Sequence, residues 1–354
     1  MQQLTDWFRR QVADPQIVFL ILFLFVGFGI VLTMGNMLMP VLAGIVIAYL
    51  LQGLVGFLER RGFAHLISVV LVFTGFMLFL VILIFGLLPL LSKQVTELIN
   101  QLPVMISQGQ TALMQLPERY PEVISTAQVQ DAMAVVRTEI ANFAQKVLSL
   151  SLSSVVGLIT ILVYLILVPL LVFFFLKDRE IIISWITGFL PSDRGLAKEV
   201  WHDVDVQIAN YVRGKFWEII IVWAASFITF RFLGLEYALL LAVLVGLSVI
   251  IPYIGAAVVT FPVLIIAWFQ WGWGPDFIWL AVAYFIIQAL DGNVLVPLLF
   301  SEVVNLHPVA IIVAILVFGG FWGFWGVFFA IPLATLVQAV LSAWPTQKIA
   351  AQEG

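Results

Sequence analysis

The fold of this chain is decided around the decapeptide Gln288-Ala289-Leu290-Asp291-Gly292-Asn293-Val294-Leu295-Val296-Pro297, which lies inside the apolar run 277–300. A run of this length and composition is typical of a membrane-spanning helix. Asp291 is too far from either end to be a boundary residue, and an ionised carboxylate at mid-membrane costs roughly 2.5–3.5 kcal/mol on insertion scales. Such a group is tolerated where it faces a cavity, an ion or a partner. Because Gly292 and Pro297 loosen the helix, we expect a broken segment near the working centre of the protein.

The composition of the whole chain indicates a polytopic membrane protein. Of its 354 residues, 63% are hydrophobic and 10% are charged, whereas a soluble domain carries about 25% charged residues. The absence of cysteine excludes disulfides, thiolate metal sites and thiol catalysis. The three histidines lack ligand spacing, and there is no Walker loop. We therefore expect no enzyme, no metal site and no cofactor, so any pumping would draw on a gradient.

The N-terminal part of the chain predicts three transmembrane helices within residues 1–91. The expected spans are Ile17–Leu32 and Met37–Leu58, joined by a tight turn at Met34-Gly35-Asn36, and then Leu66–Leu91. Each approaches the roughly 20 residues that cross the hydrocarbon. A fourth span is expected within residues 151–176. Together with the C-terminal part, this predicts an all-α protein with about eight transmembrane helices.

The distribution of basic residues predicts the orientation of the chain. With the N-terminus inside, the inner segments hold eleven of the sixteen lysines and arginines. The positive-inside rule then favours cytoplasmic N- and C-termini, including the tail 345–354, in the inner membrane of a bacterium. Residues 92–150 would lie outside, and residues 177–215 would form amphipathic helices on the cytoplasmic surface.

Residues 92–150 are expected to form a helical hairpin that projects from the membrane. The apolar residues of its second arm alternate steps of four and three; they are Val129, Met133, Val136, Ile140, Phe143, Val147 and Leu150. This 3.5-residue repeat is typical of helices that wind around one another. Two interpretations remain open: the two arms pack only on each other, or the stripe also contacts neighbouring subunits.

Residues 216–344 are expected to form a bundle that contains broken or re-entrant helices. One break is predicted at Ile251-Pro252-Tyr253-Ile254-Gly255, and a glycine-rich bend at Gly319, Gly320, Gly323 and Gly326. The spacing of Gly319 and Gly323 allows close helix packing. The alternative is that the carbonyls of these glycines line a constriction in a pathway.

Asp291 is interpreted as the one carboxylate deep within a span. A carboxylate so placed can hold a proton or a monovalent cation alternately, which is the minimal chemistry of exchange. Gln288 shares its helical face if the helix persists, whereas Asn293 would come round only if the helix unwinds at Gly292. In the alternative, structural interpretation Asp291 pairs with Arg231 or caps broken backbone.

Several motifs, taken in order, cover nearly the whole chain. They are Tyr211-Val-Arg213-Gly214, Ile251-Pro252-Tyr253-Ile254-Gly255, Gln288-x-x-Asp291 followed by Pro297, Leu306-His307-Pro308, and the ending Gly326–Pro332. In this order they resemble the autoinducer-2 exporter (AI-2E) family of bacterial permeases. The resemblance implies a multi-pass inner-membrane protein, usually with eight spans, that forms a homo-oligomer such as a pentamer. Members of the family resemble either exporters of a furanone-type signal or sodium(lithium)/proton antiporters.

Three functions follow from these observations. Exchange of a monovalent cation for protons across the lipid bilayer needs few polar groups and fits one buried aspartate best. Export of a small hydrophilic solute is the alternative, although Gln288, Asn293, Tyr253 and Ser248 offer few polar contacts for such a ligand. A non-transporting oligomeric scaffold would explain the projecting hairpin and would leave Asp291 unexplained.

Overall fold

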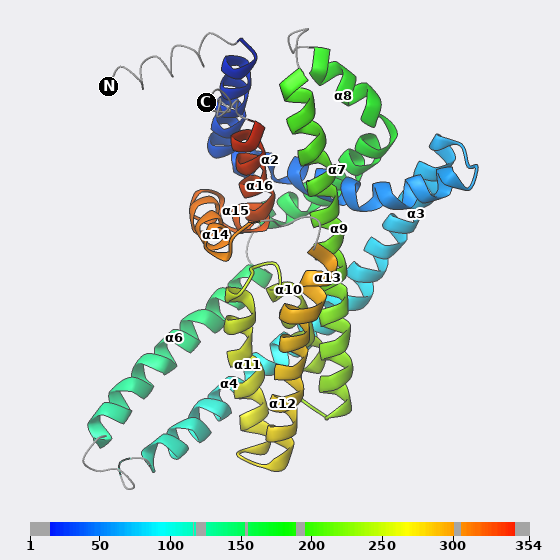
Figure 1. Ribbon diagram of the computed structural model, residues 1–354. Coiled ribbons are helices and arrows are strands. Elements are labelled where there is room, and N and C mark those ends of the chain that lie inside the picture. The colour runs from blue at the N-terminus through cyan, green and yellow to red at the C-terminus, as the bar shows by residue number, and fades with distance from the viewer. Residues whose placement is uncertain are drawn as a thin grey trace, which may run out of the picture.

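The computed structural model describes residues 15–115, 117, 125–152, 155–188, 195–300 and 306–343. Every regular element in these ranges is a helix, which confirms the predicted all-α fold (Figure 1). The first half contains α2 (Pro15–Arg60), α3 (His65–Ile82), α4 (Leu88–Met114), α6 (Thr126–Leu152), α7 (Val155–Lys177) and α8 (Arg179–Gly188). The second half contains α9 (Gly195–Phe232), α10 (Ala238–Ser248), α11 (Ile254–Trp271), α12 (Pro275–Leu290), α13 (Val296–Phe300), α14 (Pro308–Trp322), α15 (Phe324–Phe328) and α16 (Ala330–Ala343). The predicted tail 345–354 lies outside the described residues.

Several of these helices can cross a membrane by length and composition. Within the described ranges there are four, namely Met37–Arg60, His65–Met114, Ile254–Trp271 and Pro275–Phe300. A fifth results if α7 and α8, which meet at a bend of 82°, count as one broken span. The apolar helices α10 and α14 are shorter. The structure thus supports a multi-pass helical membrane protein, and the predicted count of about eight spans is not confirmed.

The helix α2 differs from the sequence-based expectation. It runs unbroken over 46 residues, so the turn predicted at Met34-Gly35-Asn36 is wrong. Glycine and asparagine weaken a helix interior only by about 1 kcal/mol each, and neither removes a backbone donor as proline does. At 1.5 Å per residue α2 is about 69 Å long, roughly twice the thickness of the hydrocarbon core.

The predicted hairpin is present as two helical arms, α4 and α6. The arms contact each other, and α4 also contacts α10, so only the far ends of the two arms project from the rest of the helices (Figure 1). Val129 and Met133 of α6 and Met105 of α4 are buried, and the Arg137 guanidinium donates a hydrogen bond to the Gln110 side-chain oxygen on the other arm. The described part of the apolar stripe therefore serves arm-to-arm packing. The side chains of its other members lie outside the described set, so contact with a neighbouring subunit stays a prediction, as does the side of the membrane.

Two widened helical turns each end two residues before a proline. They are the π-helical turns η1 (Leu83–Leu87), followed by Pro89, and η2 (Asp291–Leu295), followed by Pro297. In each, the N–H just before the proline bonds to a carbonyl five residues back, Leu88 to Leu83 and Val296 to Asp291. Proline lacks an N–H and its ring collides with the carbonyl four residues earlier, and one extra residue in the turn relieves both problems. The predicted break at Asp291 is therefore a widening, and the helix continues into α13.

The helix α9 lies at the centre of the molecule and crosses the expected boundary between residues 215 and 216 without a break. It contributes to two of the three hydrophobic clusters. One surrounds Tyr284 with α10, α11 and α12, and the second surrounds Tyr211 with α13, α14 and α16. The third joins α2, α3 and α7 around Val55. Gly214 is required where α9 meets α13, because a Cβ there would lie 2.8 Å from the Phe300 ring.

Both predicted C-terminal breaks are present. Between α10 and α11 the chain bends so tightly that a Cβ on Gly255 would lie 1.7 Å from the Ser248 carbonyl oxygen. At the other break α14 continues through Gly319 and Gly320 and ends before Gly323, whose φ of 58° favours glycine. The next helix then folds back onto α14, because a Cβ on Gly326 would lie 1.8 Å from the Phe318 carbonyl oxygen. At both predicted breaks, a glycine therefore allows the backbone of one helix to contact the backbone of the helix before it.

Candidate functional site

An ion pair is buried at the middle of α9. The Lys215 ammonium lies 2.6 Å from a carboxylate oxygen of Glu218, and the two side chains are only 5% and 3% exposed. The spacing of three residues places both side chains on one face of the helix. A pair so completely removed from water needs further partners, since desolvation of both charges offsets most of their attraction.

The helix break between α10 and α11 supplies one of those partners. The Lys215 ammonium also donates a hydrogen bond to the Val249 carbonyl at 2.9 Å. This residue follows the last turn of α10, where carbonyls have no partner within the helix and carry partial negative charge. On another side the ammonium faces the Phe300 ring of α13, with the ring centre 5.1 Å away. Lys215 therefore joins α9, the α10 break and α13.

Asp291 is partly buried and lies within electrostatic range of this ion pair, although no ion pair within 4 Å joins its carboxylate to Lys215. The turn η2, which begins at Asp291, packs against α9. The carboxylate is close enough to interact electrostatically with both Lys215 and Glu218. One of its oxygens, Oδ1, is buried and accepts no hydrogen bond from any described residue. We refer to Lys215, Glu218 and Asp291 together as the buried charge cluster.

A second network of polar side chains begins on α12, at Gln288 and Tyr284, which precede Asp291 by about one and two helical turns. The Gln288 amide donates to the Tyr284 hydroxyl at 2.6 Å, and that hydroxyl lies 3.0 Å from the Thr260 hydroxyl of α11. Thr260 in turn donates to the Ala256 carbonyl at 2.7 Å, just after the α10–α11 break. Gln288 is therefore engaged by Tyr284, and this chain links α12 to the first turn of α11.

The other residues predicted for the pathway fall into separate groups. Gly292, Asn293 and Pro297 are exposed, and Asn293 donates to the Ala289 carbonyl of its own helix at 2.8 Å. Pro252 and Tyr253 form the α10–α11 break, where Tyr253 is 61% exposed with φ of 64°. The predicted glycines Gly319, Gly320, Gly323 and Gly326 lie at the α14–α15 bend, where Gly319 and Gly326 allow close packing and Gly320 and Gly323 have open space around them.

Arg231 does not belong to the buried charge cluster. It is exposed and lies in the last turn of α9, sixteen residues after Lys215. Along a continuous helix that separation is about 24 Å. The structure thus holds Arg231 away from Asp291, and the basic residue near the aspartate is Lys215.

Sequence analysis missed two members of the cluster. Glu218 is a second buried carboxylate, which sequence analysis did not single out, and the depth of Asp291 in a membrane span stays a prediction. The sequence does carry a signal for this ion pair, namely Lys215-Phe-Trp-Glu218. Its two opposite charges are one helical turn apart, at the point where the amphipathic part of α9 becomes apolar. The meeting of this pair with Asp291 depends on tertiary packing.

The comparisons with known proteins agree with this arrangement of helices. A sequence model described as AI-2E family transporter matches residues 17–346. The chain belongs to the AI-2E family. It is 47% identical over 351 residues to PerM of Escherichia coli K12, which is named as a permease, and the match covers 99% of both chains. It is 28% identical to YueF of Bacillus subtilis 168, named as a transport protein, over 92% of this chain and 90% of that one.

Membership of the AI-2E family confirms the resemblance found in the sequence and establishes a permease-type membrane protein. A permease name is compatible with a protein that is not an enzyme. The names of these two relatives specify no substrate.

Proposed function

We propose that this AI-2E protein is a gradient-driven permease that exchanges a monovalent cation for a proton at the buried charge cluster. The observation that carries the proposal is the buried Oδ1 of Asp291, which no described residue satisfies with a hydrogen bond. Buried carboxylate oxygens are normally hydrogen-bonded or bound to a cation. A carboxylate oxygen without a hydrogen-bond donor, close to other charges, can bind a proton or a monovalent metal ion.

The charges of the cluster support exchange between two monovalent species. With Lys215, Glu218 and Asp291 all ionised, one positive and two negative charges leave a net charge of −1. One proton cancels that charge, and so does one sodium or lithium ion. Because an uncompensated charge in a low-dielectric interior is unfavourable, the two species compete for the same place. Competition for a single negative charge is the basis of one-for-one exchange.

The position of Asp291 in its span is also suited to transport. It lies sixteen residues from Pro275 and nine from Phe300, the ends of the candidate span. At 1.5 Å per residue these separations are about 24 Å and 14 Å, so we expect the carboxylate to lie within the hydrocarbon thickness. The widened turn η2 and the breaks near Gly255 and Gly319–Gly326 provide irregular backbone around it, which transporters use at mid-membrane sites. We expect these segments to expose Asp291 alternately to the two sides.

The exchange can be tested in liposomes that contain the purified protein and a pH-sensitive dye. Sodium or lithium added outside should drive protons out of the vesicles, and potassium serves as a comparison ion. Asp291→Asn keeps the size of the side chain and removes its titration, so cation-driven proton flux should fall to the level of empty vesicles. Asp291→Glu should keep part of the flux with a changed pH dependence.

The matched control is Asp276→Asn, which makes the same chemical change at an exposed position in the first turn of α12. It should leave the flux unchanged. Normal flux through Asp291→Asn would make this carboxylate structural. A wild-type protein that moves no protons in response to any of the three ions would refute cation/proton exchange, and export of a small hydrophilic signal would then be the function to test.

A further inference from the structure

A cavity of about 310 Å³ lies between α2, the start of α8 and α9, and its lining includes no member of the buried charge cluster. Small-molecule sites typically measure about 300–1,000 Å³, so this volume admits a small ligand as well as water. Its α2 wall includes Gly53, Gly56 and Arg60, and its α9 wall includes Asp205 and Arg213. These positions repeat at intervals of three, four or eight residues, so each helix presents one face to the cavity.

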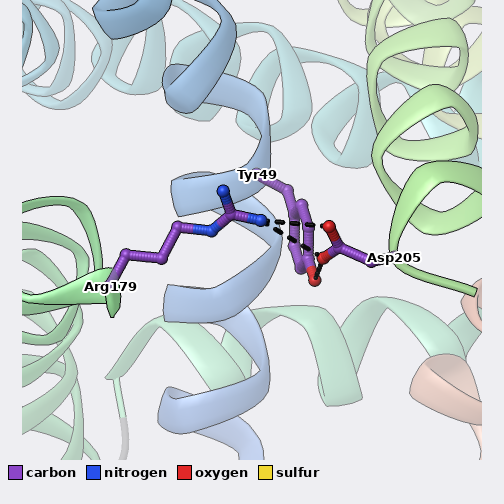
Figure 2. A network of polar contacts seen from close by, with 3 residues as sticks. All are labelled: Tyr49, Arg179 and Asp205. Carbon is purple, nitrogen blue, oxygen red and sulfur yellow. Dashed lines mark hydrogen bonds and ion pairs between the residues drawn. The ribbon is translucent and has the colours of Figure 1, made fainter. Parts of the chain in front are cut away.

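The acidic residue of this cavity is already neutralised. Asp205 accepts a hydrogen bond from the Tyr49 hydroxyl and pairs with the Arg179 guanidinium, whose nitrogen lies 3.0 Å from one carboxylate oxygen and 3.4 Å from the other (Figure 2). The three residues come from α2, α8 and α9 and converge on a single point, as Figure 2 shows. This network fixes the wall of the cavity, because both carboxylate oxygens have partners.

Two guanidinium groups at the same cavity have no such partner. Arg60 and Arg213 form no ion pair with any described residue; Arg213 donates only through Nε, to the Ala209 carbonyl at 3.0 Å. The acid next to Arg60 in sequence, Glu59, is held 2.6 Å from His65. Once Arg179 and Asp205 cancel, the described side chains that line the cavity carry two excess positive charges.

The glycines of α2 keep the space in front of these guanidiniums open. A Cβ on Gly56 would meet nothing within 4 Å, and a Cβ on Gly53 would meet only the Arg213 side chain, at 3.7 Å. Neither glycine has the positive φ that would require this residue type. Glycine is a weaker helix former than alanine, so two glycines here weaken α2. Their effect here is to leave room beside Arg60 and Arg213.

We propose that this cavity binds an oxyanion of the phosphate class between the guanidiniums of Arg60 and Arg213. A guanidinium presents several N–H groups in one plane and matches the oxygens of a phosphate two at a time. Two guanidiniums balance the charge of a phosphate dianion, and they exceed the single negative charge of a phosphodiester by one. The oxyanion is either free phosphate or the headgroup of an anionic phospholipid, which share this chemistry. The site is separate from the exchange chemistry, although Arg213 stands only two residues before Lys215 on α9.

The test uses the full-length protein in nanodiscs of phosphatidylcholine, at an ionic strength of about 0.15 M so that weak surface attraction is screened. Calorimetry measures binding of inorganic phosphate. Native mass spectrometry counts the phosphatidylglycerol molecules retained when this lipid is mixed into the discs. The variant Arg60→Gln with Arg213→Gln should weaken whichever binding the wild type shows by roughly 10- to 100-fold for each arginine removed.

Arg61→Gln is the matched control, because it removes the same charge from the adjacent position, where the guanidinium lies over the Phe57 ring, 4.4 Å from its centre, and outside the cavity lining. Gly56→Leu provides a second test that leaves all charges in place. Its side chain should occupy part of the cavity in front of the guanidiniums and weaken binding, and this variant decides the question if the double arginine variant does not fold.

Each outcome has a definite meaning. Phosphate binding in phosphatidylcholine discs that is lost in the double variant supports a site for free phosphate. Retention of phosphatidylglycerol by the wild type and Arg61→Gln, but not by the double variant or Gly56→Leu, supports a headgroup site. The proposal is overturned if the wild type binds neither probe, or if the double variant and Gly56→Leu bind both as well as the wild type does.

Discussion

Removal of the Lys215 ammonium should destabilise this protein far more than removal of an exposed lysine. In Lys215→Met the side chain becomes one atom shorter, stays unbranched, and loses both its ion pair with Glu218 and its hydrogen bond to the Val249 carbonyl. Breaking a buried pair by removal of one partner costs about 3–5 kcal/mol, because the other charge stays buried without compensation. An unsatisfied buried carbonyl adds about 1–3 kcal/mol. The free energy of unfolding should therefore fall by about 4–8 kcal/mol.

The origin of the loss can be separated with a second substitution. Lys215→Met combined with Glu218→Leu removes the orphaned carboxylate, and apolar replacements for a buried pair are often neutral or stabilising. The double variant should therefore be more stable than Lys215→Met alone by at least about 2 kcal/mol, with the remaining loss assigned to the Val249 carbonyl.

The control is Lys93→Met on α4. Lys93 forms an ion pair with Glu97 at 3.8 Å, and the two side chains are 74% and 50% exposed. A pair so open to solvent contributes only about 0–1 kcal/mol, so this substitution should have little effect. Unfolding can be followed by tryptophan fluorescence as sodium dodecyl sulfate is titrated into detergent micelles. Equal losses for the two lysines, or a double variant no more stable than Lys215→Met, would refute the buried-pair argument.

Further predictions concern the bend, the hairpin and the orientation. Gly326→Ala should lower the melting temperature strongly, because its Cβ would lie 1.8 Å from the Phe318 carbonyl oxygen. The Cβ of Gly320→Ala would meet nothing within 4 Å, so this control should be neutral or slightly stabilising. Equal effects of the two substitutions would argue against the folded-back bend. Met133→Asp places a charge at a side chain that is 5% exposed, so proteolysis should cut the hairpin sooner in the variant than in the wild type while the spans stay inserted. A cysteine at Gln110 should react with an impermeant thiol reagent on intact cells, and reaction only after permeabilisation would reverse the orientation.

Sequence analysis predicted the class of this protein and much of its local structure. High apolar content determines a membrane protein because helices satisfy their own backbone hydrogen bonds in lipid. The 3.5-residue stripe from Val129 predicted the helical arm α6, and Pro252 with Gly255 predicted the break before α11. Each of these signals acts over one or two turns, so it can be read without knowledge of the fold.

Sequence analysis failed where a local signal was too weak to overcome its surroundings. Gly35 and Asn36 are compatible with a turn, yet the apolar helix on either side carries α2 straight through them. Near Asp291 the proline signal was read correctly as an irregularity, while its form, one widened turn, depends on how the helix accommodates Pro297.

The sequence by itself determined a helical membrane protein of the AI-2E type with a carboxylate, Asp291, in the apolar interior of a span. Only the tertiary structure decided which groups surround that carboxylate. Lys215 and Glu218 precede it by more than seventy residues, and the Val249 carbonyl belongs to a third segment. No periodicity or spacing relates positions so far apart, because their approach depends on how α9 packs against the α10 break and η2. The same holds for the cavity of Arg60 and Arg213, whose helices meet only in the folded chain.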